Sequence, residues 1–176
     1  SNTPFNGYKA SPFEGGIASP GIVHWLAGLK VKPGTISDEK AHLVDWMPTL
    51  IELTGGIYPE QGNNGPAGKL VGASMTPVFA GKPIEREMPL YFRWGSLRGL
   101  IQDDWKIASY YRAPFELFHL ADDPCETRDL AAQHPEKLET LETQWWRIAR
   151  EVDELPEMWL KANDQPRREI FRGIIS

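Results

Sequence analysis

The feature that most limits what this chain can fold into is a run of short β-rich segments joined by very short turns. The segments are residues 89–94, residues 97–101 continuing through 105–111, and residues 115–120. The turns between them are Gly95-Ser96, Asp103-Asp104 and Ala113-Pro114. Connections this short join neighbouring antiparallel strands, whereas parallel strands need a crossover of a dozen or more residues. The pattern therefore predicts an antiparallel meander.

An amphipathic helix follows the predicted meander. Apolar residues recur at spacings of three and four and form one stripe: Leu138, Leu141, Trp145, Ile148 and Val152. Pro135 suits the first turn of a helix, where its missing N–H has no intrahelical partner. We expect this helix to cover one face of the meander. Beyond Pro156, apolar residues alternate with charges, which predicts an extended tail packed on the body.

The first half of the chain carries a different pattern. Residues 13–29 join a glycine turn to a short apolar run, which is typical of a buried strand. A helix is predicted over residues 45–55, because Asp45 can cap its start and the Gly-Gly pair at its end can terminate it. Residues 58–69 are rich in Gly, Asn and Pro and predict a surface loop.

Composition and charge exclude several classes of protein. The chain has 176 residues, 41% of them hydrophobic, so it can bury a sizeable core. Its net charge is -5 with both signs interspersed, and no run of Lys and Arg marks a nucleic-acid groove or an anionic membrane surface. The longest apolar stretches fall well short of the ~20 residues of a membrane-spanning helix. Neither nucleic acid nor a membrane span is therefore expected, and the single Cys125 leaves the compartment open.

Common catalytic motifs are absent from the sequence. It has no GxGxxG, no phosphate-binding loop ending in Lys-Ser or Lys-Thr, no HExxH and no GxSxG. Cys125 lies in an acidic turn with no basic neighbour to activate a thiol, so an inert cysteine is expected. The acids of this turn have the spacing of a turn and helix entry rather than of a calcium loop. They are Asp122, Asp123, Glu126 and Asp129.

The remaining chemistry-bearing residues form blocks that begin near the start of the chain. The first are Gly7-Tyr8-Lys9, Glu14-Gly15-Gly16, and Pro20 before an apolar run that reaches His24-Trp25. The later ones are His42-Leu43-Val44-Asp45 with Met47-Pro48-Thr49-Leu50, Asp104-Trp105-Lys106, residues 117–124, and Glu126 with Asp129-Leu130-Ala131. In order and spacing these blocks resemble the sulfatase family, and arylsulfatases in particular. The resemblance covers about residues 3–150.

The resemblance implies a fold and a domain organisation. Residues 1–86 correspond to the C-terminal end of the sulfatase α/β catalytic domain, made of strand, helix and loop. Residues 87–176 correspond to a small C-terminal subdomain, an antiparallel sheet packed with a long amphipathic helix. The chain itself is thus expected to be α+β, as part of a protein whose catalytic domain is α/β.

What the resemblance implies about the site centres on Lys9. In sulfatases the matching lysine contacts the sulfate and the modified nucleophile, and a fixed ammonium suits the charge that develops on the sulfate oxygens. The family's nucleophile is a formylglycine made from a Cys or Ser upstream, beside calcium or another divalent cation held by Asp and Asn. Neither the nucleophile motif nor the ligand pair is matched here, so this fragment is expected to hold no metal and to be inactive by itself.

Five further residues are candidates for a supporting position or a substrate pocket: Glu14, His24, His42, Arg93 and Arg98. Glu14 could orient Lys9 or cap neighbouring amides. The structural alternative for His24 is a hydrogen-bonded core histidine, and for His42 a local hydrogen bond at a helix start. The two arginines could line a pocket beside the site or belong to cross-strand pairs.

Three hypotheses about function remain open. The first is a sulfuric ester hydrolase acting on a sulfated small molecule or carbohydrate, for which the resemblance favours a periplasmic or secreted location. The second is a phosphodiester or phosphonate monoester hydrolase of the same alkaline phosphatase-like superfamily, and the third is a non-catalytic binding module.

Two departures and one liability complete the sequence picture. Many relatives carry His and Glu around positions 92–95 and an Arg near 101, whereas this chain has Phe92, Arg93, Trp94 and Ile101. The resemblance therefore carries over no substrate preference. A strand separated from its sheet could also pair with a second chain, so the fragment is a candidate for oligomerisation.

Overall fold

The computed structural model describes residues 2–63, 65–110 and 113–152, and the predicted tail beyond Pro156 lies outside these ranges. The chain divides into two compact units. One unit contains residues up to Pro20 together with those from Pro89 onward, and the other contains Gly21–Met88. The domain organisation predicted from the sequence groups residues 1–20 with residues 21–86, whereas the structure groups them with the residues from Pro89 onward.

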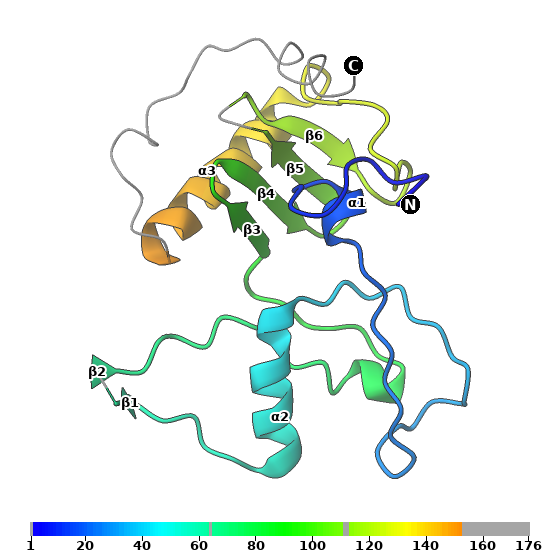
Figure 1. The fold of residues 1–176 in the computed structure, drawn as a ribbon, viewed down its shortest axis with the longest axis vertical. Coiled ribbons are helices and arrows are strands. Elements are labelled where there is room, and N and C mark those ends of the chain that lie inside the picture. The colour runs from blue at the N-terminus through cyan, green and yellow to red at the C-terminus, as the bar shows by residue number, and fades with distance from the viewer. Residues whose placement is uncertain (1, 64, 111–112, 153–176) are drawn as a thin grey trace. The chain divides into compact units, whose positions relative to one another are not determined.

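The predicted meander is confirmed. Figure 1 shows four antiparallel strands in sequence order, β3 (Leu90–Trp94), β4 (Leu97–Gln102), β5 (Trp105–Ser109) and β6 (Glu116–His119). The turn residues Gly95 and Asp103 both have positive φ angles, +55° and +57°. Glycine adopts this conformation freely and aspartate tolerates it better than most residues, which explains how two-residue turns connect these strands.

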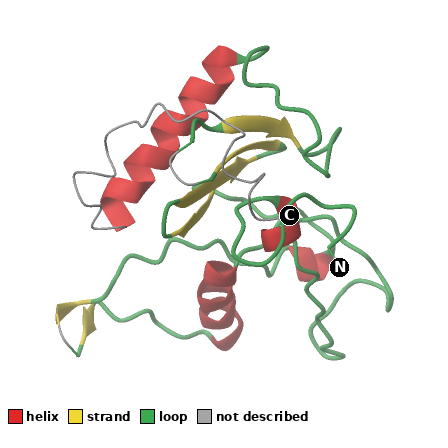
Figure 2. Cartoon of the chain, turned by 45° about the horizontal axis from the view of Figure 1, so that its top comes forward, coloured by secondary structure: helices red, strands yellow, loops and turns green. Residues whose placement is uncertain are grey.

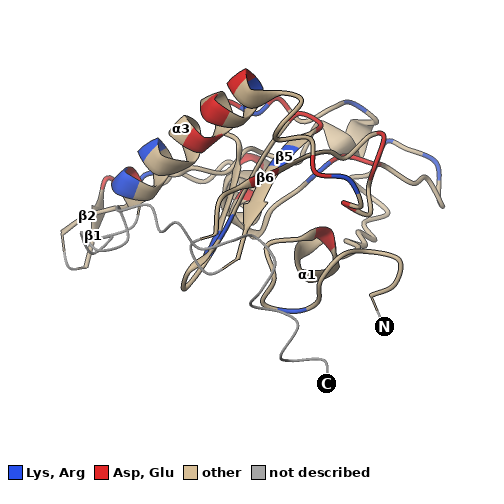
Figure 3. Cartoon of the chain, turned by 90° about the horizontal axis from the view of Figure 1, so that it is seen from above, with Lys and Arg blue, Asp and Glu red and all other residues tan. Residues whose placement is uncertain are grey.

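Helix α3 (Pro135–Val152) covers one face of the sheet, as the apolar stripe predicts (Figure 2). Trp145 is 1% exposed and its ring lies 5.4 Å from that of Tyr91 and 5.8 Å from that of Phe115. Figure 3 shows acidic residues toward the start of α3 and basic residues toward its end. This arrangement complements the helix macrodipole, which is positive at the N-terminus.

The opposite face of the sheet is covered by the first residues of the chain. Phe13 is 2% exposed, stacks on Tyr110 with ring centroids 4.7 Å apart, and meets Phe118 edge-on at 5.8 Å. The short helix α1 (Glu14–Ile17) follows, and Ile17 packs against a buried cluster that includes Leu90. The sheet is therefore buried on both faces by segments that are far apart in the sequence.

The second unit is built around helix α2 (Trp46–Thr54), which the short 3-10 helix η1 (Leu43–Asp45) precedes. Gly55 ends α2 in the left-handed conformation with φ +66°, as predicted. The predicted cap at Asp45 was wrong in detail, because its side chain makes no cap bond to α2. Asp45 instead closes a capping box with His42 at the start of η1.

Loops make up most of the rest of this unit. The Gly- and Asn-rich loop is exposed, as predicted, and contains a minimal hairpin of β1 (Gln61–Gly62) and β2 (Gly65–Pro66). A single 3-10 turn, η2 (Val78–Ala80), follows and buries Phe79.

The buried strand predicted within residues 13–29 was wrong. Its first part forms α1, and residues 18–25 have no regular structure. Ile22 and Leu26 are 91% and 88% exposed. A strand needs a neighbour to accept its backbone hydrogen bonds, and within the described ranges no strand pairs with this segment.

Candidate functional site

Lys9 is exposed and lines a surface pocket of about 390 Å³. Four of the lining residues come from the first loop and four from α1 and the residues after it. They are Asn2, Thr3, Phe5 and Lys9, and Gly15, Gly16, Ala18 and Ser19. A lysine beside polar side chains is suited to hold a small anion.

Two glycines of α1 determine how closely it packs against residues 6–11, the loop that carries Lys9 (the Lys9 loop). The N–H of Gly15 donates to the carbonyl of Asn6 at 2.7 Å. A Cβ atom on Gly15 would lie 2.3 Å from the carbonyl oxygen of Gly7, and one on Gly16 would lie 2.3 Å from that of Ser11. Because these neighbours are backbone atoms, a side chain at either position would push the loop away from the helix.

Glu14 is bound to the sheet rather than to Lys9. The ammonium of Lys106, on β5, lies 2.7 Å from Oε1 of Glu14 and 2.7 Å from Oε1 of Glu126. The second oxygen of Glu126 accepts the main-chain N–H of Glu14 at 2.7 Å. Burial raises the pKa of Glu126, and the nearby Lys106 partly offsets that effect.

The Lys106 cluster (Lys106, Glu14 and Glu126) was missed by reasoning from the sequence. Lys106 stands between Trp105 and Ile107 in an otherwise apolar strand, and its side chain is fully buried. A charged residue at an inward position of a predicted strand was the available signal, because such a charge must find a partner.

The acidic turn has the structural role that the sequence predicts. The carboxylate of Asp123 accepts the N–H groups of Thr127 and Arg128 at 2.7 and 2.9 Å. One oxygen of Asp129 accepts the N–H of Leu117, at the start of β6, at 3.0 Å. Both acids therefore hold backbone, and Cys125 between them is partly exposed.

Arg93 and Arg98 are not brought together with Lys9. They lie directly opposite each other on β3 and β4, on the face of the sheet that α3 covers. The guanidinium of Arg98 lies 4.3 Å from the ring centroid of Phe115 and donates to Ser109 Oγ at 2.9 Å. Burial lowers the pKa of Arg98. Arg98 thus joins the sheet to α3, whereas the Lys9 loop packs on the other face.

His24 and His42 both lie in the second unit. His24 is exposed, so the alternative of a core histidine was wrong, because the strand that would have buried it does not form. Nδ1 of His42 accepts the N–H of Val44 at 3.3 Å, which is the local hydrogen bond expected at a helix start. Burial lowers the pKa of His42, although the charge of Asp45 acts in the opposite direction.

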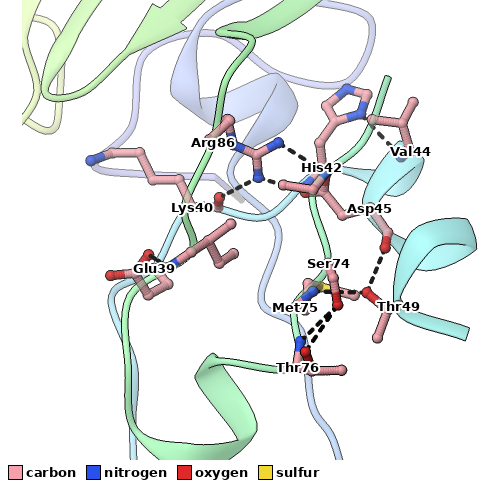
Figure 4. Close-up of polar contacts among 12 residues, drawn as sticks. Glu39, Lys40, His42, Val44, Asp45, Thr49, Ser74, Met75, Thr76 and Arg86 are labelled. Carbon is pink, nitrogen blue, oxygen red and sulfur yellow. Dashed lines mark hydrogen bonds and ion pairs between the residues drawn. The ribbon is translucent and has the colours of Figure 1, made fainter. Parts of the chain in front are cut away.

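Asp45 is the centre of the second unit (Figure 4). Its two oxygens accept from both terminal nitrogens of Arg86 at 2.9 and 2.7 Å, and also from the N–H groups of His42 at 2.6 Å and Ala73 at 2.9 Å. Burial alone would raise the pKa of Asp45, but these hydrogen bonds and the charge of Arg86 hold it below its ordinary value. No pattern in the sequence indicates that Asp45 pairs with Arg86.

Comparisons with known proteins point to sulfatases. No family model matches the chain. Arylsulfatase J of Mus musculus is 45% identical over 60 residues, which are 34% of this chain and 10% of that protein. A sulfatase of Formosa agariphila is 24% identical over 177 residues, 94% of this chain and 31% of that protein, and arylsulfatase K of Xenopus laevis is 27% identical over 153 residues, 77% and 26% of the two.

The chain is similar in sequence to sulfatases along nearly its whole length. It spans about a third or less of the length of these curated sulfatases.

Two solved structures show the same fold as this chain. One, described as BT33336S-sulf, aligns with a TM-score of 0.64 at 22% identity over 83% of this chain and 32% of that chain. The other, Ps i-CgsB, aligns with a TM-score of 0.63 at 23% identity over 99% of this chain and 36% of that chain. The predicted α+β arrangement, an antiparallel sheet packed with a helix as in the sulfatase fold, is therefore confirmed.

Several of the sequence blocks shared with sulfatases meet in space. The Gly-x-Lys and Glu-Gly-Gly blocks form the pocket at Lys9. Glu14 from the second of these, Lys106 from the Asp-Trp-Lys block and Glu126 from the last block make the Lys106 cluster. These blocks thus supply residues of the pocket and all three residues of the Lys106 cluster.

The described residues contain neither a cluster that could hold a metal ion nor a helix that could span a membrane. Among the described residues, no three His, Cys, Asp or Glu side chains are arranged to hold a metal ion, and the calcium that the resemblance to sulfatases implies for the full-length enzyme stays a prediction. None of the helices within residues 2–152 that the structure describes combines the length and apolar character needed to cross a bilayer.

Proposed function

We propose that the full-length protein hydrolyses sulfate esters and that Lys9 binds the sulfate group. The observation that carries this proposal is the position of Lys9, which is exposed and lines a pocket together with α1 and the residues after it, in a chain similar to sulfatases. No carboxylate of the described residues forms an ion pair with Lys9. Glu14, the acid nearest to it in the sequence, binds Lys106 instead. The ammonium is therefore available to an anion.

The chemistry proposed for Lys9 is electrostatic. A sulfate ester breaks through a transition state with negative charge on the sulfate oxygens, and a cation already fixed beside them needs no reorganisation as that charge develops. The two glycines contribute by fixing the loop against α1, which limits how far the ammonium can move. Lys9 assists the reaction and is not its nucleophile.

The proposal includes a nucleophile and a cation contributed by residues upstream of Lys9. The resemblance to sulfatases supports a formylglycine as the nucleophile and calcium or another divalent cation beside it. Such a cation would act as a Lewis acid on the sulfate group. Within this chain, Cys125 is set in a turn that holds backbone, which does not favour a role as the nucleophile.

A sulfated carbohydrate is the substrate class we propose. The similar structure Ps i-CgsB has been solved in complex with k-i-k-neocarrahexaose. An ulvan-active sulfatase of Formosa agariphila is 31% identical over 70 residues, 40% of this chain and 12% of that protein. These relatives support a sulfated sugar as the natural substrate.

The test uses the full-length protein with an aryl sulfate, the matching aryl phosphate and a panel of sulfated oligosaccharides. Lys9→Ala is expected to lower kcat/KM for sulfate esters by about 100- to 1000-fold, the effect of removing one preorganised charge-stabilising donor. Lys82→Ala is the matched control, because Lys82 is an exposed lysine of the other unit, and it should leave turnover unchanged.

Each other outcome has a defined meaning. Unchanged turnover of sulfate esters by Lys9→Ala would exclude the role proposed for Lys9. Preference for the phosphate ester would favour the phosphodiester or phosphonate hydrolase, and no turnover of any ester by the full-length protein would favour a binding module.

A further inference from the structure

The unit that carries the pocket also contains a buried polar centre, the Lys106 cluster. Lys106 contacts two carboxylates at 2.7 Å each, so the three groups carry one negative charge in excess when both acids are ionised. The side chains of Lys106 and Glu126 are fully buried, and that of Glu14 is 15% exposed. Burying charges in this way costs free energy that the ion pairs only partly offset.

The backbone at Glu126 adds a second cost. Its φ angle is +55°, in the left-handed region that residues with a Cβ atom disfavour. Glycine would adopt this conformation without strain and would remove one buried charge. A carboxylate is nevertheless present, and its two oxygens contact Lys106 and the N–H of Glu14. Both contacts converge on the first residue of α1, either directly or through Lys106.

Glu14 is held at two points. Its side chain binds Lys106 and its main-chain N–H binds Glu126. The apolar anchors on either side, Phe13 and Ile17, fix the depth of the segment on the sheet. Apolar contacts are not directional, whereas hydrogen bonds to charged groups define an orientation. The cluster therefore determines how α1 is turned and where along the sheet it lies.

The position of α1 passes directly to the pocket. Gly15 and Gly16 follow Glu14, line the pocket, and touch the backbone of the Lys9 loop so closely that no side chain would fit. The amide of Asn2 also donates to the carbonyl of Gly15. A movement of Glu14 would thus displace one wall of the pocket and the loop that carries Lys9.

We infer that Lys106 is a positioning residue, which, together with Glu126, holds Glu14 and so sets the distance and direction of Lys9 relative to a bound sulfate. The inference rests on the proposed function of Lys9 and adds a residue that touches neither substrate nor pocket. A displacement of about 1 Å at a reacting centre can lower a rate by about 100-fold, so a remote ion pair can matter for turnover.

The decisive experiment is a double-mutant cycle in the full-length protein. Lys106→Met and Glu14→Ala are each combined with Lys9→Ala, and kcat and KM are measured for an aryl sulfate. In the presence of Lys9, each single variant is expected to lower kcat by about 10- to 100-fold. In the Lys9→Ala background the same changes should cost less than about 3-fold, because the residue they position is gone. Losses that multiply in full would overturn the inference.

Two further variants separate positioning from loss of the fold. Glu14→Gln keeps an oxygen acceptor for Lys106 and should retain most of the activity that Glu14→Ala loses. Glu139→Ala, an exposed glutamate of α3, is the matched control and should behave as the wild type. Lys106→Met leaves two carboxylates without their partner, so if it fails to fold the cycle is read from Glu14→Ala, whose side chain is partly exposed.

Hydrogen exchange gives a readout that does not depend on catalysis. In Glu14→Ala the amides of residues 6–9 should exchange faster, while those of β4 and β5 stay as protected as in the wild type. Unchanged exchange in the loop would overturn the positioning role even if Lys9 proves essential. Conversely, faster exchange with no effect of Lys9→Ala on turnover would show that the proposed function had failed and the positioning had not.

Discussion

The two units of the molecule are stabilised in different ways. In the first, Leu100, Ile107 and Leu117 are fully buried, and the sheet that carries them is covered on both faces. In the second, Ile22 and Ile57 are 91% and 94% exposed, and the buried residue of α2 is Thr49. The hydrophobic effect therefore dominates the order of the first unit. The second unit buries Met75 and Phe79 but depends more on hydrogen bonds and on the ion pair of Asp45 with Arg86.

The polar centre of the second unit extends beyond Asp45. The hydroxyl of Thr49 donates to the carbonyl of Asp45 at 2.6 Å and accepts the N–H of Met75 at 2.9 Å. Asp45 at the end of η1 and Thr49 in α2 are both buried, and together they bind Arg86 and the loop at residues 73–75 (Figure 4). Such a centre depends on each partner, because a buried polar group that loses its partner is costly.

The largest expected effect belongs to the hydrophobic unit. Phe13→Ala removes a 2% exposed ring that contacts Tyr110 and Phe118, and it should lower the free energy of unfolding by about 3–5 kcal/mol. Urea titration followed by circular dichroism measures this loss. Phe5→Ala, in the same segment but 39% exposed, is the control and should cost under about 1 kcal/mol. Equal losses would show that the segment is not anchored through Phe13.

A smaller loss is expected at the polar centre of the other unit. In Asp45→Asn the side chain loses its negative charge and one of the two oxygens that accept from Arg86. This change should destabilise the unit by about 2–4 kcal/mol. Faster hydrogen exchange of the α2 amides would report it locally. Asp38→Asn, at an exposed position, should stay within about 0.5 kcal/mol of the wild type. An Asp45→Asn protein with unchanged exchange would contradict the role given to this carboxylate.

Acidity should affect the two units in opposite directions. The pKa of Asp45 is lowered from its ordinary value of 3.8, so its contribution is complete above that pH and is lost as the pH falls through the folded-state pKa. The pKa of Glu126 is raised from 4.5, so its contribution is complete below that pH and is lost as the pH rises through the folded-state pKa.

Two variants make this opposition measurable. The cost of Asp45→Asn should shrink in acid, whereas the cost of Glu126→Gln should shrink as the pH rises above 4.5. Unfolding by urea at a series of pH values from about 3 to 7 compares the two. Parallel pH profiles would show that one of the two carboxylates has been assigned the wrong environment.

The smallest effect is expected on the exposed side of α2. Leu50 is 50% exposed, so Leu50→Gln should change the free energy of unfolding by no more than about 0.5 kcal/mol. Leu141→Gln, at a fully buried leucine of α3, is the matched comparison and should cost more than about 3 kcal/mol. If the two substitutions proved equally costly, α2 would have an apolar core of its own and the contrast between the units would fail.

The sequence predicted the parts of the fold that depend on local patterns. The meander and α3 follow from turn residues and from apolar spacing, both of which act over a few residues. The strand predicted after residue 13 failed because an apolar run such as the one around Ile22 becomes a strand only beside a partner. Periodicity alone does not say whether that partner exists.

The candidate site was predictable only in part. Lys9 was predicted from the resemblance to sulfatases, and the structure places it with Gly15 and Gly16 around one pocket. The role of Glu14 was missed because its partner Lys106 is 92 positions away, and nothing local to either residue indicates the pairing. Similarly, Arg93 and Arg98 could not be assigned to a face until the strand register was known.

The span of the Lys106 cluster along the chain has a consequence for synthesis. Its three members stand at positions 14, 106 and 126, and a ribosome makes the chain from the N-terminus. Glu14 lacks its partner Lys106 until residue 106 has left the ribosome, and it lacks the acceptor for its own N–H until residue 126 has followed. The loop that carries Lys9 is among the first segments of this chain to be made and among the last to reach its final conformation.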